Sequence, residues 1–282
     1  MKKIKYYFQI IRPINFIITF ASIFVAGIIC SGLKIVWVNI ILASLSGGLV
    51  GAAGNVINDI YDFEIDKINR PQRPLPSGNL SKNRALYFYY LVNIIALIIA
   101  TQINIFSFFI VIISEISIFF YSLKLKKIPL LGNFVVSFFT GFAFIFGGAS
   151  VNNIDNSLIP AVFALLINFI REIVKDIEDI KGDTKESVIT FPAIYGAKLS
   201  VKIIVYLTLM LILLTLIPIA YNIYGKVYFY SIIPVNSLLL YFIIKISNDY
   251  SQSNLMKMSS LLKLNMVLGL ISIYFGIKGF NF

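Results

Sequence analysis

Long stretches of apolar residues alternate with short polar segments along the whole chain. Nine of the stretches are long enough to cross a bilayer as helices, which takes roughly 17 to 25 residues. They run over residues 13–32, 37–60, 84–101, 104–122, 130–149, 157–175, 197–219, 227–246 and 260–280. Lipid offers no hydrogen-bond partners to an exposed backbone, and the alternating pattern of a β-barrel is missing. The pattern therefore predicts an all-α, polytopic membrane protein with nine transmembrane helices.

Composition agrees with a membrane protein, and the basic residues predict its orientation. The chain is 59% hydrophobic and only 13% charged. With nine crossings, 21 of the 24 lysine and arginine residues fall on one side of the membrane. Cytoplasmic segments are enriched in these residues, so the N-terminus and the basic loops are predicted to be cytoplasmic, in a multi-pass protein of the cell membrane. This bias and the attraction of anionic lipids explain the net charge of +11 without a nucleic-acid partner.

The few acidic residues are concentrated in two short segments on the predicted cytoplasmic side. Of 13 acids, four lie in residues 59–66 and six in residues 172–186. Three aspartates in each segment are spaced i, i+3 and i+7, which places them on one face of a helix. These are Asp59, Asp62 and Asp66 in the first motif, and Asp176, Asp179 and Asp183 in the second. A solvated surface would explain one such trio, but not its repetition on two helices that cross in the same direction.

Three carboxylates on one face repel each other, and the negative end of the helix dipole adds to the repulsion. Mg²⁺ is a natural counter-ion, because it binds through one or two carboxylates together with phosphate oxygens of a substrate. The chain has no histidine and one cysteine, Cys30. A histidine base, His-ligated zinc or haem, and a cluster of thiolate ligands are therefore excluded.

Basic residues flank both acidic motifs. Arg70 and Arg73 follow the first motif in a segment with three prolines, which predicts an extended, stiff loop. Arg171 and Lys175 precede the second motif, and Arg12 lies at the start of the first helix. Arginine binds phosphate through its bidentate fork, and lysine acts as a point charge. Acids, metal and cations together predict a diphosphate site, although the positive-inside bias explains any single cation equally well.

These motifs resemble those of the UbiA-type intramembrane prenyltransferases. The sequences NDIYDFEID and DIEDIKGD are similar to the two acidic signatures of that family, and RPINF, RPQRPLPSG and YSLKLKKIPLLGN follow the expected order. The resemblance spans essentially the whole chain. It implies a single domain over residues 1–282, folded as a bundle of nine helices around a central cavity open to lipid. It also implies that Mg²⁺ and a prenyl diphosphate donor bind at the acidic faces, next to membrane lipids.

The resemblance implies a role for each matching residue. The implied Mg²⁺ ligands are Asn58, Asp62, Asp66, Asp176, Asp179 and Asp183. The implied substrate-binding residues are Arg12, Asn58, Arg70, Arg73, Tyr121, Lys126, Arg171 and Lys175. The candidate catalytic residues are Asp59, Asp62 and Asp179. Because histidine is absent, Asp59 or a diphosphate oxygen is expected to take the proton of the acceptor hydroxyl.

The acceptor is a finer question within the family. Members that act on 4-hydroxybenzoate often carry a Tyr-Ala pair ahead of the second motif, where this chain has Val174 and Lys175. The sequence is most similar to the archaeal branch that moves a geranylgeranyl group to the hydroxyl of geranylgeranylglyceryl phosphate, forming the second ether bond of archaeal membrane lipids. Lys175 would suit such a phosphorylated, lipid-like acceptor. An aromatic acceptor, for example another quinone precursor, stays open, and a cation transporter is a further alternative.

Glu115 stands apart from both acidic motifs, inside the fourth predicted helix. Acids within transmembrane segments are rare, and they tend to face a partner or a cavity. Glu115 is interpreted either as a hydrogen-bonded packing residue or as a polar contact in a reaction chamber.

Overall fold

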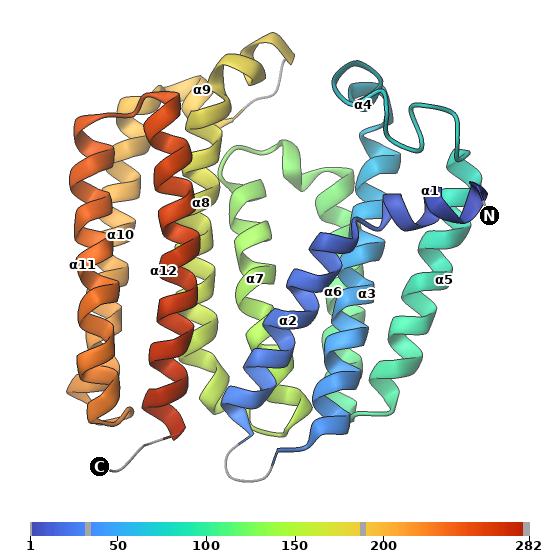
Figure 1. The fold of residues 1–282 in the computed structure, drawn as a ribbon. Helices are drawn as coiled ribbons and strands as arrows, with labels where there is room; N and C mark the ends of the chain where they lie inside the picture. Colours follow the sequence, from blue (N-terminus) through green and yellow to red (C-terminus); the bar gives the residue numbers. More distant parts are fainter. Residues whose placement is uncertain (1, 32–34, 187–189, 279–282) are drawn as a thin grey trace. The chain divides into compact units, whose positions relative to one another are not determined.

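The computed structural model describes residues 2–31, 35–186 and 190–278, and every regular element within these ranges is a helix (Figure 1). Nine helices of this described part are long and apolar enough to cross a membrane. They coincide with the nine predicted stretches, and most of their ends agree within two residues. The predicted all-α, multi-pass class is thereby confirmed. The chain divides into two compact units, and the division runs through α7 and α8.

The first unit comprises Met1–Leu125 and Ala143–Ser157. Its helices are α1 (Lys2–Ile10), α2 (Pro13–Cys30), α3 (Trp37–Tyr61), α4 (Phe63–Asn69), α5 (Lys82–Thr101), α6 (Ile105–Leu123) and the end of α7 (Leu131–Ser150). Helix α3 packs against α2, α5 and α6. A Cβ at Gly48 would lie 2.7 Å from Phe16 of α2, and a Cβ at Gly54 would lie 2.9 Å from Ile118 of α6. Small residues thus allow the close helix packing that holds α3, and with it the first acidic motif.

The second unit comprises Lys126–Phe142 and Leu158–Phe282. It contains the short η1 (Leu125–Lys127), the start of α7, and α8 (Asp155–Glu186), α9 (Phe191–Tyr195), α10 (Ala197–Ala220), α11 (Lys226–Asn248) and α12 (Gln252–Lys278). Its core is a cluster of apolar side chains, among them the fully buried Ile173, Ile204, Phe242 and Leu262. Helix α7 approaches α8 closely, because a Cβ at Gly141 would lie 2.5 Å from the carbonyl oxygen of Ala161. This core holds the helix that carries the second acidic motif.

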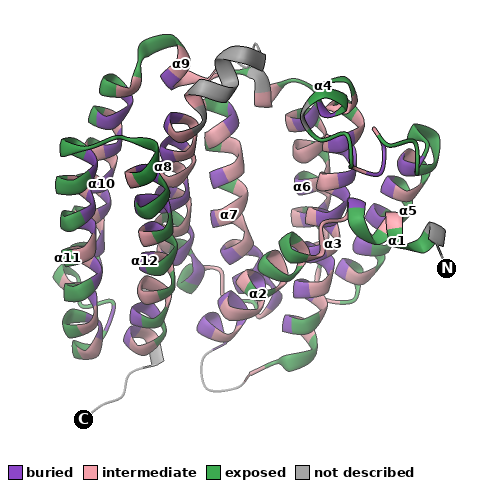
Figure 2. Cartoon of the chain, turned by 45° about the horizontal axis from the view of Figure 1, so that its top comes forward, coloured by how far each residue is buried: buried purple, intermediate pink, exposed green. Residues whose placement is uncertain are grey.

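Large apolar side chains remain exposed along the outer helices of each unit. Examples are Ile94 and Ile98 of α5, Phe109 of α6, and Leu213 of α10, each about half exposed or more. Exposed and buried residues alternate along α10, α11 and α12 (Figure 2). Such exposed apolar surface is unfavourable in water and suits contact with lipid tails.

Two helix boundaries and one short helix differ from the prediction. Helix α8 continues to Glu186 instead of ending near residue 175, and the buried Ile177 and partly buried Ile180 extend its packed face beyond the end of the apolar run. Helix α12 begins at Gln252 rather than near residue 260. Helix α1 was not predicted, since nine residues are too few to span a bilayer. Hydropathy gives the length of an apolar run, but a helix can continue beyond that run into polar residues.

Candidate active site

The first acidic motif lies where α3 ends. The predicted single helix is interrupted, because α3 stops at Tyr61, α4 starts at Phe63, and Asp62 joins them with φ −87° and ψ 6°. Backbone hydrogen bonding nevertheless continues. The Asp62 N–H donates to the backbone carbonyl oxygen of Asn58 at 2.9 Å, and the Asp66 N–H donates to the backbone carbonyl oxygen of Asp62 at 2.8 Å. The interruption lies at a predicted metal ligand, where the chain bends out of α3.

Asp59 is a buried carboxylate that pairs with two arginines. Its side chain is 4% exposed. Its Oδ1 accepts a charge-assisted hydrogen bond from Nη2 of Arg12 and a second one, at 3.2 Å, from Nη1 of Arg73. The same Nη1 of Arg73 also donates to Oδ2 of Asp66 at 2.5 Å. These four residues form an arginine–aspartate cluster with two positive and two negative charges.

Arg12 enters this cluster from the junction between α1 and α2. Its backbone is left-handed, with φ 52° and ψ 79°, which is unusual for a residue other than glycine. The carbonyl group of the preceding Ile11 accepts a hydrogen bond from the Asn55 side chain of α3 at 3.1 Å. Asn55 and Asp59 are four residues apart on α3, so one helix face binds both the backbone beside Arg12 and the Arg12 guanidinium.

Arg73 enters the cluster from the proline-rich loop, and the predicted extended form of that loop is wrong. The loop is a series of turns. In these turns the Ser77 N–H donates to the backbone carbonyl oxygen of Arg73 at 3.0 Å, and the Leu80 N–H donates to that of Pro74 at 3.0 Å. Proline fits such turns because its fixed φ suits their second position. Leu75 and Leu80 are buried against residues of α3 and α5, which folds the loop back and holds Arg73 in place.

Asn58 and Asp62 form the other polar pair of the first motif. The Asn58 side-chain amide donates to Oδ2 of Asp62 at 2.9 Å, and both residues are half-buried. The motif therefore offers carboxylate and amide oxygens, which are the hard donors that Mg²⁺ prefers. No three carboxylates of the described residues are gathered into a closed metal cage. This donor set fits an ion that completes its coordination with phosphate oxygens and water.

The second acidic motif lies on the uninterrupted helix α8. Oδ2 of Asp176 accepts a hydrogen bond of 2.7 Å from the Asn133 side chain of α7. Asn133 was not among the predicted site residues. The backbone of α8 passes through Asp179 and Asp183, but their side chains lie outside the described part of the chain. Their predicted roles as metal ligands remain predictions.

Two predicted phosphate-binding cations of α8 converge on a residue to which no role was assigned. Arg171 and Lys175 each donate to Oε1 of Glu172 at 3.0 Å. Nε of Arg171 is buried and has no hydrogen-bond partner among the described residues. Lys175 is 38% exposed at its side chain, so it can reach other anions. Glu172 therefore binds both cations, and only its position in the acidic segment could have suggested this.

Three further predicted residues lie in the segments that follow α3. Arg70 ends α4 and is exposed, while Tyr121 of α6 and Lys126 of η1 are half-buried. Glu115 lies in α6 with Oε1 buried, and that oxygen has no hydrogen-bond partner among the described residues.

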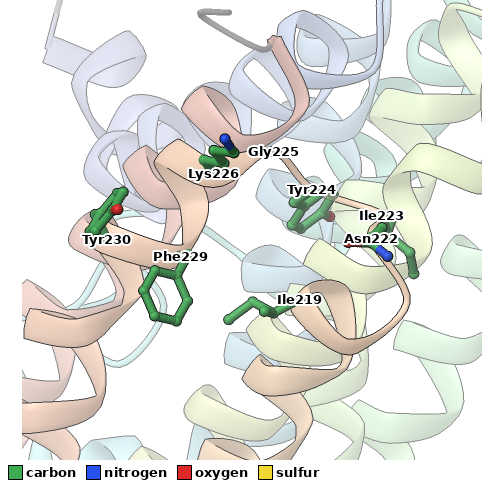
Figure 3. Close-up of a pocket in the computed structure, with 8 residues that line it drawn as sticks. All are labelled: Ile219, Asn222, Ile223, Tyr224, Gly225, Lys226, Phe229 and Tyr230. Carbon is green, nitrogen blue, oxygen red and sulfur yellow. The ribbon is translucent and has the colours of Figure 1, made fainter. Parts of the chain in front are cut away.

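A pocket of about 530 Å³ opens in the second unit, where α10 is joined to α11 (Figure 3). Its lining includes Asn222, Tyr224, Lys226 and Tyr230, with Phe229 beside them. The lining contains one cation and no carboxylate, so it lacks the donor set that a metal-bound diphosphate needs. The acidic motifs remain the candidate active site.

Comparison with known proteins places these motifs in a family. Residues 17–267 match the UbiA prenyltransferase family. The chain is 35% identical over 270 residues to digeranylgeranylglyceryl phosphate synthase of Methanosphaera stadtmanae, covering 96% of this chain and 98% of that protein. It is 38% identical over 275 residues to the enzyme of the same name from Methanococcus aeolicus, covering 97% and 98%.

Solved structures give the same result. A structure of digeranylgeranylglyceryl phosphate synthase matches with a TM-score of 0.88, 34% identity and 99% coverage of both chains. A UbiA homologue from Archaeoglobus fulgidus, bound to GPP and Mg²⁺, matches with a TM-score of 0.70, covering 95% of this chain and 99% of that one. At 18% identity it supports the fold alone. The chain therefore belongs to the UbiA prenyltransferase family, as its two acidic motifs indicated.

Proposed function

We propose that this prenyltransferase moves a geranylgeranyl group from geranylgeranyl diphosphate to the hydroxyl of geranylgeranylglyceryl phosphate. The product would be the diether lipid phosphate of archaeal membranes. The observation that carries the proposal is the pairing of oxygen donors with arginines at the end of α3, in a chain that shares 35% to 38% identity with enzymes of that name over nearly its full length. An anionic, lipid-soluble diphosphate matches this combination of charge and membrane setting.

Mg²⁺ fits the proposed site by the chemistry of its donors. Asn58, Asp62 and Asp66 of the first motif and Asp176, Asp179 and Asp183 of the second would hold it. When bound, the ion neutralises charge that develops on the departing diphosphate. The carboxylates set the affinity for the metal, since hard oxygen ligands are what Mg²⁺ selects.

The residues of the chain then serve the transfer by binding and orienting the reactants. Arg12, Arg73 and Lys126 would hold the diphosphate as the bond between its oxygen and the first carbon of the prenyl chain breaks, and the diphosphate leaves with both electrons. The acceptor oxygen forms the new carbon–oxygen bond. Its proton passes to a diphosphate oxygen or to Asp59. Apolar surroundings keep water from capturing the allylic group.

The acceptor phosphate is assigned to the cations of the second unit. Arg171 and Lys175 share the single carboxylate of Glu172, so this group of three side chains carries one net positive charge. A phosphorylated acceptor would compensate that charge, whereas a neutral aromatic acceptor would not. The basic-rich ends of the helices, and with them both motifs, are proposed to face the cytoplasm.

Transfer of a labelled geranylgeranyl group by purified protein in lipid nanodiscs tests the proposal. Asp62→Ala and Asp179→Ala are expected to abolish transfer while the protein still folds. Glu64→Ala is the matched control, because Glu64 lies in the same segment, is exposed, and pairs only with Lys67 among the described residues. Retained activity in both aspartate variants would contradict the metal assignment.

The acceptor is tested in the same preparation by offering geranylgeranylglyceryl phosphate and 4-hydroxybenzoate in parallel. A labelled ether lipid supports the proposal. A product formed only from the aromatic acceptor would overturn the assignment within the family, and ion flux without diphosphate binding would favour a transporter.

A further inference from the structure

The arginine–aspartate cluster of Arg12, Asp59, Asp66 and Arg73 carries more information than the presence of acids and cations. We infer that Asp59 is a positioning residue: it holds the guanidinium groups of Arg12 and Arg73 side by side, so that their remaining N–H groups bind the diphosphate of the donor. This inference rests on the proposed function, because the prenyl diphosphate supplies the anion. It separates Asp59 from the metal ligands and from the proton acceptor.

The contacts of Asp59 favour an anchor over a metal ligand. Both arginines donate to the same oxygen, Oδ1, and the side chain is 4% exposed. With two charge-assisted bonds on one oxygen and so little access, the charge of this carboxylate is compensated by the arginines. Asn58 and Asp62, by contrast, are half-buried and pair with each other through a neutral amide. The two kinds of environment within five residues indicate two kinds of role.

The arginines keep donors for a second anion while they bind Asp59. Arg73 reaches both Asp59 and Asp66 through Nη1, and Arg12 reaches Asp59 through Nη2. A guanidinium has five N–H groups in a rigid fork, so each arginine retains N–H groups that make no contact with a described carboxylate. Phosphate binds well to such a fork, and two adjacent forks match the two phosphates of a diphosphate.

Helix α3 supplies the rigid frame for this arrangement. Asn55 binds the backbone of Ile11, and Asp59, one turn later, binds the Arg12 side chain. The left-handed backbone of Arg12 is a conformation that persists only where its surroundings enforce it. Arg73 is fixed from the other side, because its loop is anchored by the buried Leu75 and Leu80. Asp59 belongs to α3 and contacts both arginines.

The charge balance explains why an aspartate is needed. The cluster holds two positive and two negative charges, and without the charge of Asp59 only the carboxylate of Asp66, which binds Arg73, remains to balance two guanidinium groups. Like charges held close together repel, and long side chains then turn toward water. Asn at this position preserves size and can still accept a hydrogen bond, but it cannot balance the charge.

The experiment measures binding and turnover separately in Asp59→Asn. We expect the KM for geranylgeranyl diphosphate and the Kd for inorganic pyrophosphate, measured by calorimetry, to rise about 10- to 100-fold, as for the loss of a partner that orients binding groups. The Mg²⁺ concentration for half-maximal activity should stay unchanged. Arg12→Ala should raise the same constants, and the double variant should be little worse than either single variant, because both changes disrupt one unit.

Asp62→Asn and Glu64→Gln are the controls. Asp62→Asn should raise the Mg²⁺ requirement, and Glu64→Gln should change none of these constants. The inference is overturned if Asp59→Asn loses turnover with unchanged KM and Kd, which would make Asp59 a base, or if it raises the Mg²⁺ requirement, which would make it a metal ligand. The inference would also be overturned if the effects of Asp59→Asn and Arg12→Ala on KM and Kd were strictly additive in the double variant and Asp59→Asn otherwise only lowered thermal stability. Pyrophosphate binding is measured without an acceptor, so a wrong acceptor assignment would leave the result readable.

Discussion

The two acidic motifs have the same spacing, but the partners identified for their described carboxylates differ in charge. In the first motif, Asp59 and Asp66 are buried and bound to arginines that come from the α1–α2 junction and from the proline-rich loop. In the second, Asp176 accepts a neutral amide bond from Asn133. The local backbone differs too, because α3 gives way to α4 at Asp62, whereas α8 continues without interruption.

This difference shows what a spacing of i, i+3 and i+7 determines. It determines which side chains share a helix face, and it leaves open which partners meet that face. A carboxylate bound to arginine has its charge compensated before any metal arrives, while an amide bond orients a carboxylate without adding a charge. We therefore expect Asp59 and Asp66 to need Mg²⁺ for charge compensation less than a carboxylate that accepts from an amide.

The largest expected effect comes from removing a carboxylate of the second motif. Asp176→Ala should lower the rate of transfer by about a thousandfold, because the proposed metal site supplies several kcal/mol of charge stabilisation in the transition state. Turnover at saturating Mg²⁺ and donor is the measurement. Glu178→Ala, two residues along α8 and without a proposed role, is the matched control. Activity in Asp176→Ala close to that of the control would remove the second motif from the metal site.

A smaller loss is expected when an arginine of the first motif becomes lysine. In Arg73→Lys, one ammonium group can replace Nη1 and neutralise Asp59 and Asp66, but the donors left for phosphate are lost. Hydrogen bonds to charged groups contribute about 1.5–3 kcal/mol, so the KM for the donor should rise about 10- to 100-fold. Arg84→Lys, at an exposed arginine of α5, is the control for charge and exchange of residue type. An unchanged KM would mean that Arg73 only neutralises the aspartates.

The sequence was sufficient to predict every membrane-length helix and the two acidic segments. Long apolar runs leave the backbone no alternative to a helix in lipid, so their existence follows from local composition alone. The same local reasoning missed α1, which is too short to span, and the continuation of α8 to Glu186, where the chain turns polar but stays helical. Packing such as that of Ile177 and Ile180 continues a helix beyond its apolar run, and hydropathy does not detect it.

The partners of the site residues were harder to predict, because they come from distant segments. Arg12 and Asp59 are 47 residues apart, and Asn133 and Asp176 are 43 residues apart. Spacing along one helix cannot identify such pairs. The three prolines predicted an extended loop, and this prediction was wrong. Burial of Leu75 and Leu80 folds the loop into turns, which place Arg73 beside the aspartates.

The amide that orients Asp176 provides a milder test of the same contrast. Asn133→Ala should raise the Mg²⁺ concentration for half-maximal activity about 10-fold, since loss of a residue that orients a metal ligand typically costs 10- to 100-fold in affinity. Asn168→Ala is the matched control, because Asn168 of α8 also bonds to α7, but to the hydroxyl of Ser137 instead of an acid. If both variants shift the Mg²⁺ requirement equally, the effect belongs to helix packing and the contrast between the motifs is weakened.

The smallest expected effect concerns Gly132, the residue before Asn133, which lies close to the backbone of Lys126. A Cβ at Gly132 would lie 3.1 Å from the carbonyl oxygen and 3.2 Å from Cα of Lys126, whereas a Cβ at Gly269 of α12 would meet nothing within 4 Å. Alanine favours a helix over glycine by about 1 kcal/mol, so Gly269→Ala should stabilise the protein. In Gly132→Ala the crowding should cancel that gain, at a cost of about 1 kcal/mol. Thermal unfolding in detergent measures both. If both variants are stabilised equally, the backbone of Lys126 moves away from the new methyl group freely, and transfer activity should be unaffected. If that backbone is held firmly against residue 132, Lys126 and Asn133 should be displaced, and activity should fall a few-fold.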